Sequence, residues 1–147
     1  METYLALPAL DNLLRAGKLK AEARSDADVE RLLAMARTRL GDAQLKGASA
    51  EGRFISAYNA AHAASLAALR WHGYRSESRF MVFQCLPHTL GWEPARWRVL
   101  DAAHRKRNLA EYEGRLEVEE SGIAELCSLT AQLIADVAKL VQPPKSG

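Results

Sequence analysis

The chain has few of the residues that sheets are built from. Val, Ile and Thr are scarce, whereas Ala and Leu make up almost a third of the 147 residues. Ala and Leu lose little conformational freedom in a helix, whereas β-branched residues lose more and favour strands. No stretch alternates between apolar and polar residues with the period of two that is typical of a half-buried strand. The composition therefore predicts an all-α fold.

The chain also has few cysteines and no long hydrophobic run. The two cysteines, Cys85 and Cys127, form no Cys-x-x-Cys pair, so nothing indicates a disulfide framework or a zinc site. The longest uncharged stretch, residues 54–69, contains Ser, Asn and His, and is shorter than the run of about 18 apolar residues that a membrane span needs. Residues 1–11 lack the basic start of a signal peptide. We expect a cytoplasmic protein with no membrane span.

Several motifs of catalytic and cofactor-binding proteins are missing. The chain has no Gly-x-x-x-x-Gly-Lys or Gly-x-Gly-x-x-Gly loop for phosphates and no Gly-x-Ser-x-Gly turn for a nucleophile. Its four histidines never stand four residues apart on one expected helix, as a helical metal site would require. We expect no metal and no cofactor, and we interpret His62 as a hydrogen-bonded histidine of a buried helix.

Helix-start and helix-stop residues divide the chain into six expected helices. Ser25 and Ser49 can cap helix N-termini, Glu93-Pro94 can open a helix, and Pro143-Pro144 closes the last one. The expected ranges are about 9–16, 25–44, 49–73, 77–86, 93–114 and 119–141. The third is apolar nearly all round, as a central helix would be. Because the connections are short, neighbouring helices are expected to be antiparallel.

The prediction is one domain over residues 1–147, since a domain typically has about 100–200 residues. The expected domain is an antiparallel bundle of four to six helices with a core over about 10–141 and a tail over 142–147.

The formal net charge of the chain is only +2. Residues 70–107 nevertheless carry eight basic and three acidic residues, whereas residues 108–147 carry three basic and seven acidic ones. Pairing between helices, or a surface with two signs of charge, would each explain this change.

The segment His104-Arg105-Lys106-Arg107-Asn108 and the turn after it carry the strongest chemical signal. On a helix, Arg107 shares a face with Leu100 and Ala103, which directs its guanidinium toward the packed side. Glu111 stands one turn later and can pair with Arg107. Asn108 and Tyr112 share the adjoining face. Such a cluster could hold a phosphate or a nucleobase, or it could be a polar network that joins helices or protomers.

The run Arg107-Asn108-Leu109-Ala110-Glu111-Tyr112 resembles the motif of HEPN domains, helical bundles in which an Arg, often followed by Asn, precedes a His on a late helix. Leu13-Leu14-Arg15-Ala16-Gly17-Lys18-Leu19 resembles the leading segment of the family. The helix from Tyr58-Asn59-Ala60-Ala61-His62 to Leu69, followed by Gly73-Tyr74-Arg75, resembles its small-residue helix. The resemblance spans about residues 10–141.

The resemblance implies a homodimer in which the Arg-Asn motifs of two protomers meet in one cleft. Active members are metal-independent endoribonucleases of toxin–antitoxin, CRISPR-associated and abortive-infection systems. Some are encoded beside a minimal nucleotidyltransferase, which modifies a tyrosine near the motif. In this chain, however, Tyr112 stands in place of the His, and Gly114 occupies the position of the modified tyrosine. A phenol with a pKa near ~10 is a poor proton acceptor at neutral pH.

The expected function is therefore a HEPN-like module that binds RNA or a nucleotide through a dimer cleft without cleaving it, in a toxin–antitoxin or defence setting. The binding residues are expected to be Arg105, Lys106, Arg107, Asn108 and Glu111. A nucleotidyltransferase-like protein is a further expected partner. Two alternatives stay open. One is a metal-independent endoribonuclease that uses Arg107, Asn108 and Tyr112, and the other is a structural dimerisation or adaptor protein.

Overall fold

The computed structural model describes residues 3–142, and the side chains of residues 8–142. It is a helical bundle with one very short sheet, which confirms the all-α prediction. The elements, in chain order, are α1 (Thr3–Arg15), β1 (Lys20–Ala21), α2 (Asp26–Ala43), α3 (Ala50–Trp71), β2 (Tyr74–Arg75), α4 (Arg79–Gln84), α5 (Leu86–Thr89), α6 (Pro94–Glu113) and α7 (Glu120–Val141). No helix in this part of the chain is long and apolar enough to cross a membrane.

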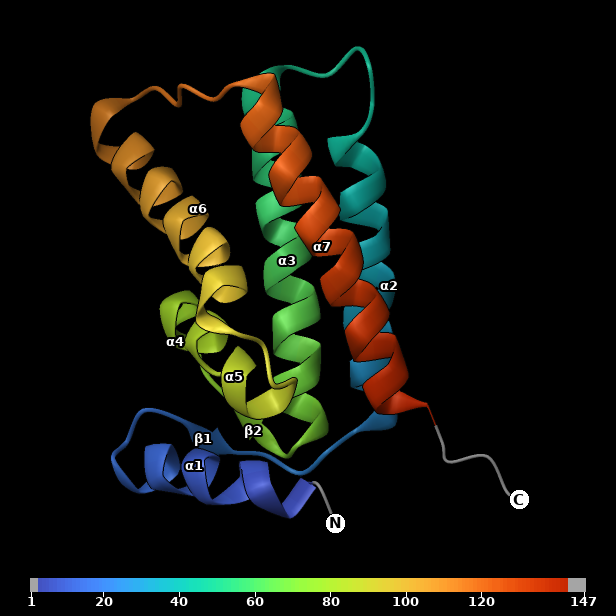
Figure 1. Ribbon diagram of the computed structural model, residues 1–147, viewed down its shortest axis with the longest axis vertical. Helices are drawn as coiled ribbons and strands as arrows, with labels where there is room; N and C mark the ends of the chain where they lie inside the picture. The colour runs from blue at the N-terminus through green and yellow to red at the C-terminus, as the bar shows by residue number, and fades with distance from the viewer. Residues whose placement is uncertain (1–2, 143–147) are drawn as a thin grey trace.

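The long helix α3 lies at the centre of the bundle (Figure 1). Helices α2 and α7 run along one side of it, and α6 lies on the other side. The short helices α4 and α5 pack below α6, and α1 crosses beneath the bundle. Helix α6 diverges from α7, so that α6 is held mainly through its lower half. This arrangement leaves much of α6 uncovered.

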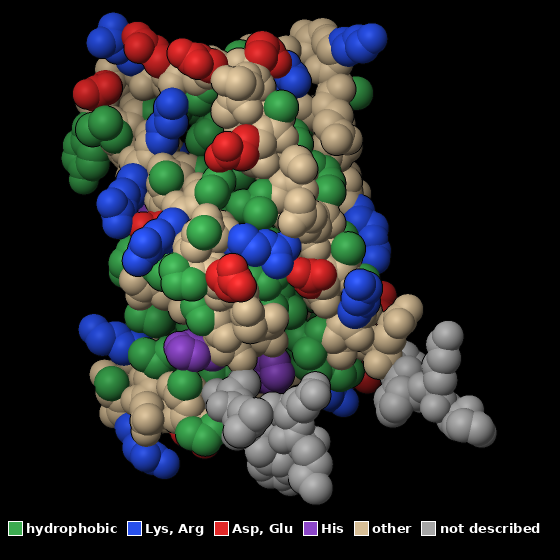
Figure 2. Space-filling view, viewed as in Figure 1, with side chains coloured by type: hydrophobic (Ala, Val, Ile, Leu, Met, Phe, Trp, Pro, Cys, Tyr) green, Lys and Arg blue, Asp and Glu red, His purple; other side chains and the backbone are tan. Residues whose placement is uncertain are grey.

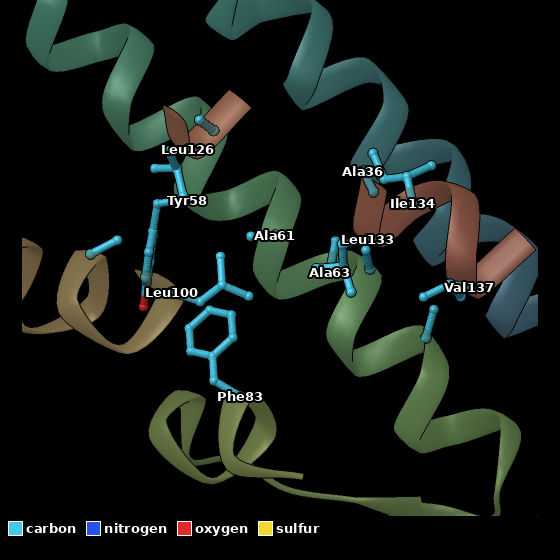
Figure 3. Packing of buried hydrophobic residues seen from close by; sticks show 14 of the residues in the cluster. Ala36, Tyr58, Ala61, Ala63, Phe83, Leu100, Leu126, Leu133, Ile134 and Val137 are labelled. Atoms are coloured by element: carbon cyan, nitrogen blue, oxygen red, sulfur yellow. The ribbon is translucent and has the colours of Figure 1, made fainter. Parts of the chain in front are cut away.

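Small residues allow α3 to be surrounded by other helices. Its buried residues include seven alanines, at positions 57, 60, 61, 63, 64, 67 and 68. An alanine side chain lets a neighbouring backbone approach closely, and the larger side chains of the neighbours fill the remaining space. Leu133 of α7 packs beside Ala63, and Val137 lies further along the same helix, whereas Leu100 of α6 and Phe83 of α4 fill the other side (Figure 3).

The helix boundaries agree closely with the caps expected from the sequence. The Ser25 hydroxyl accepts a hydrogen bond from the Asp28 backbone N–H at 3.3 Å, and the Ser49 hydroxyl accepts one from Gly52 at 2.9 Å. Pro94 begins α6, and Gly114 ends it with a φ of 73°, a left-handed conformation that favours glycine. These local signals were therefore sufficient to predict where α2, α3 and α6 begin.

Three features of the fold differ from the sequence expectations. Helix α1 begins at Thr3 instead of near residue 9, and Pro87 lies in the first turn of the separate short helix α5 instead of only ending its predecessor. The chain also forms a small antiparallel sheet, in which Lys20 pairs with Arg75 and Ala21 pairs with Tyr74. A strand of two residues is too short to produce a detectable period. Pro143 and Pro144 lie outside the described residues.

Replacing Ala64 by Leu tests whether close packing around α3 is required. Ala64 is fully buried, so a larger side chain must displace its neighbours, and we expect Ala64→Leu to lower the free energy of unfolding by about 1–3 kcal/mol. The matched control is Ala34→Leu at an exposed position of α2, which should change it by less than about 0.5 kcal/mol. Urea denaturation measures the free energy of unfolding of both variants. Equal effects of the two variants would contradict the packing argument.

Candidate functional site

The candidate site forms where the packed face of α6 leaves the core. Leu100 and Ala103 on this face are buried, and the next turn carries His104, Arg107 and Asn108, which are half-buried. The side chain of Arg107 is 30% exposed, so its guanidinium lies against the protein. The predicted placement of Arg107 on the packed side of the helix is therefore confirmed.

A chain of hydrogen bonds joins α6 to the central helix. The Arg107 guanidinium donates to Asn108 Oδ1 at 3.4 Å, and Asn108 Nδ2 lies 3.0 Å from His104 Nε2. The other ring nitrogen of His104, Nδ1, lies 2.8 Å from the hydroxyl oxygen of Tyr58 on α3. We call these four residues, Tyr58, His104, Arg107 and Asn108, the α6 network.

The direction of each hydrogen bond follows from Arg107. A guanidinium can only donate, so the Asn108 oxygen faces it and the Asn108 amide N–H groups face His104. His104 Nε2 then accepts, which places the ring proton on Nδ1, where it is donated to the Tyr58 oxygen. Both nitrogens of the His104 ring are therefore engaged. The imidazole positions its neighbours and has no free lone pair in this arrangement.

Electrostatics keep the histidines of this region neutral. Burial lowers the pKa of His104, Asp101 opposes this, and the Arg107 and Arg79 charges lower it further. Burial also lowers the pKa of His62, one turn beyond Tyr58 on α3, to about 4, with smaller contributions from Arg79, His104 and Arg107. Burial raises the pKa of the Tyr58 phenol, against the opposing effect of Arg79 and Arg107. These groups are therefore uncharged at neutral pH.

A second wall of the site comes from α4. The Arg79 guanidinium carbon lies 5.5 Å from the centre of the Tyr58 ring, and that of Arg107 lies 5.6 Å from it. Both distances are within the range of cation–π contacts. Arg79 also donates to Asn59 Oδ1 at 3.1 Å, and the Phe80 and Phe83 rings flank His104. Two guanidinium groups from different helices thus share one aromatic ring.

The other residues predicted for the site lie around this network. Arg107 pairs with Glu111 at 3.2 Å, as expected from their spacing. Arg105 is exposed and pairs with buried Asp101 at 2.8 Å, and Lys106 is exposed. Tyr112 is 90% exposed. The Asn108 amide nitrogen lies 3.0 Å from His104 Nε2, and the Asn108 oxygen accepts from Arg107.

The sequence predicted no site role for Tyr58, Arg79 or His104, although His104 begins the segment with the strongest chemical signal. His104 stands three residues before Arg107 and four before Asn108, a helical spacing that could have placed it in the cluster. Nothing in the sequence links Tyr58 or Arg79 to Arg107, because they are far apart along the chain. His62 is half-buried, and its ring makes no hydrogen bond among the described residues, contrary to our interpretation.

The surface around α6 carries the charge change expected from the sequence. In Figure 2, blue Lys and Arg side chains lie along the side of the molecule where α6 runs, and red side chains gather at the end where α6 is joined to α7. Among the described residues, no three His, Cys, Asp or Glu side chains come together as a metal site would require. The arrangement is suited to binding an anion through guanidinium groups.

Lowering the pH should destabilise the fold through His62. The folded chain keeps this ring neutral down to a pKa of about 4, whereas the unfolded chain takes up a proton near the ordinary histidine pKa of 6.5. Proton uptake by the unfolded state lowers the free energy of unfolding as the pH falls through this window, by about 1–2 kcal/mol between pH 7 and pH 5. We expect His62→Gln to lose this part of the pH dependence in urea denaturation. The same pH dependence in both proteins would contradict the assignment.

No family model, no curated protein and no solved structure matches the chain. The resemblance to HEPN domains therefore rests on the motif residues themselves.

Proposed function

We propose that this chain is a HEPN-like helical module that binds RNA or a nucleotide through Arg107 and its neighbours without cleaving it. The observation that carries the proposal is the half-buried Arg107 guanidinium, held in place through Asn108, His104 and Tyr58. A guanidinium with a fixed orientation loses little freedom when it binds a phosphate, and its planar fork matches the phosphate oxygens. Arg105 and Lys106 add positive charge to the neighbouring surface.

The hydrogen bonds of His104 support binding over catalysis. Cleavage of RNA at its 2′-hydroxyl needs a general base within reach of that group. His104 uses both ring nitrogens within the α6 network, and the pKa of His62, about 4, makes it a weak base. Tyr112 is a phenol at an exposed position. The endoribonuclease alternative therefore lacks a suitable base among the described residues of this region.

Exposed apolar side chains beside the network support a homodimer as part of the proposal. Leu109 and Tyr112 lie one turn apart on α6 and are both exposed, and Phe80 of α4 is partly exposed next to His104. Exposed apolar residues grouped near a charged site are typical of a surface that a partner covers. A second copy would bring two Arg107 side chains toward one cleft. We place this dimer in the cytoplasm, in a toxin–antitoxin or defence setting, with a nucleotidyltransferase-like protein as a further partner.

Replacing Arg107 by Ala tests the proposal. Purified protein is mixed with a labelled structured RNA in EDTA, and both binding and RNA integrity are measured over a series of salt concentrations. We expect wild-type protein to bind and the RNA to stay intact. We expect Arg107→Ala to weaken binding about tenfold and to reduce the slope of log K against log salt by about 1 per protomer, because one phosphate contact is lost.

The matched control is Arg37→Ala on α2, which removes the same charge from an exposed position away from α6. It should leave the affinity within about twofold of wild type. Unchanged binding by a folded Arg107→Ala protein would reject the proposed contact. Cleavage that disappears in Arg107→Ala would instead establish the endoribonuclease alternative.

The adaptor alternative has one observation in its favour, since the α6 network is internal and joins α6 to α3. If that were its only role, the wild-type protein would have no affinity for RNA. Arg107→Ala would then alter the dimer or the stability alone. Sedimentation of both proteins at one concentration, beside the RNA titration, separates the two functions.

A further inference from the structure

A pocket lies between α2, α3 and α4, next to the α6 network. Its volume is about 300 Å³, at the lower end of the range of small-molecule sites, which is about 300–1,000 Å³. The apolar wall consists of Leu32, Met35 and Leu66. The polar lining consists of Arg39, Asn59, His62 and Arg79, which come from three different helices. Such a combination of one apolar wall and a few converging polar groups is typical of a ligand site.

Arg79 is the main cation of this pocket. It is half-buried, and it forms no ion pair with an Asp or Glu among the described residues, whereas Arg107 pairs with Glu111. Its hydrogen bond goes to the neutral Asn59 amide oxygen. A half-buried charge without a carboxylate partner is costly unless an anion compensates it. The positive charge of Arg79 is therefore available to a ligand.

The other polar groups complete a site for an oxyanion. Arg39, an exposed residue of α2, also lines the pocket, and its distance of 3.6 Å from the partly exposed Asp42 makes that pairing weak. The Asn59 oxygen accepts from Arg79, which leaves the two Asn59 amide hydrogens free to donate. Two guanidinium groups together match the double negative charge of a phosphate monoester better than the single charge of a carboxylate.

His62 and the apolar wall indicate which chemical group the phosphate of the ligand carries. The neutral His62 ring offers one donor and one acceptor, and neither is used in a hydrogen bond among the described residues. Met35 is 50% exposed at the rim, where its flexible side chain can pack against a flat ring. These features suit a nucleobase or a similar polar heterocycle.

We propose that this pocket binds the terminal phosphate monoester of a nucleotide, with Arg79 and Arg39 on the phosphate and with Met35, Leu32 and His62 beside the base. The site is separate from the surface of Arg105, Lys106 and Arg107, and it does not depend on RNA binding there. The ligand is either a free mononucleotide or the phosphorylated end of an RNA chain, because both present the same group.

Calorimetric titration with AMP and with adenosine tests the pocket. We expect AMP to bind and adenosine, which lacks the phosphate, to bind at least about tenfold more weakly. Arg79→Gln should weaken AMP binding at least about tenfold, and Arg79→Lys should weaken it less, because it keeps the charge but loses the fork. Arg37→Gln, on the exposed face of α2, is the control and should bind AMP as the wild type does.

A second variant leaves the cations in place. Met35→Asp puts a carboxylate at the rim and should repel the phosphate, whereas Ala34→Asp, at the exposed position next to it, should have little effect. The NMR resonances of the His62 ring should shift when AMP is added to the wild type. Thermal unfolding of each variant identifies any loss that comes from misfolding.

The outcomes separate this inference from the proposed function. No AMP binding, equal binding of adenosine, or AMP binding that is unchanged in folded Arg79→Gln and Met35→Asp proteins would each overturn the pocket assignment, whatever Arg107→Ala does to RNA binding. RNA oligonucleotides with a 5′-phosphate or a 5′-hydroxyl identify the source of the phosphate. A preference for the 5′-phosphate that depends on Arg79 assigns the site to RNA ends, and AMP binding without that preference assigns it to free nucleotides.

Discussion

The close packing of other helices around the alanine-rich helix α3 is the constraint on which the rest of the structure depends. Seven buried alanines let α2 and α7 approach one side of α3 while α6 and α4 pack on the other. Large residues at these positions would force the helices apart. The candidate site needs this closeness, because the Tyr58 hydroxyl of α3 must reach His104 of α6, which it does at 2.8 Å.

Tyr58 is the point at which the core and the site meet. It is almost completely buried, and its ring packs against Phe83 while its hydroxyl holds the imidazole of α6. A buried hydroxyl that lost its partner would destabilise the fold, so the hydrogen bond to His104 contributes to the stability of the folded chain. The orientation of Arg107 is in this way coupled, through Asn108 and His104, to the packing of the core.

Each of the two proposed anion sites has a guanidinium group beside the ring of this tyrosine. Arg107 from α6 and Arg79 from α4 both lie near the face of the Tyr58 ring. Arg107 has a carboxylate neighbour in Glu111 and opens onto the basic surface of α6, whereas Arg79 borders a small pocket and has no such neighbour among the described residues. The first arrangement suits an extended polyanion, and the second suits a compact terminal phosphate.

Much of the fold follows from the sequence, since helix formation depends on local residues. The caps at Ser25, Ser49 and Gly114 and the apolar stripes predicted the long helices, and the spacing of Arg107 and Glu111 predicted their ion pair. The two-residue strands could not be predicted, because pairing of residues 20–21 with 74–75 is a contact between distant parts of the chain.

The candidate site also has a part that follows from local sequence and a part that depends on contacts between distant residues. The sequence by itself determined that Arg107, Asn108 and Glu111 lie along one side of a helix, since a turn of 3.6 residues decides which side chains are neighbours. Only the tertiary structure decided that Tyr58 and Arg79 join the site. The physical reason is that a buried hydroxyl and a half-buried guanidinium take the partners that packing brings within reach, and packing is set by the whole chain.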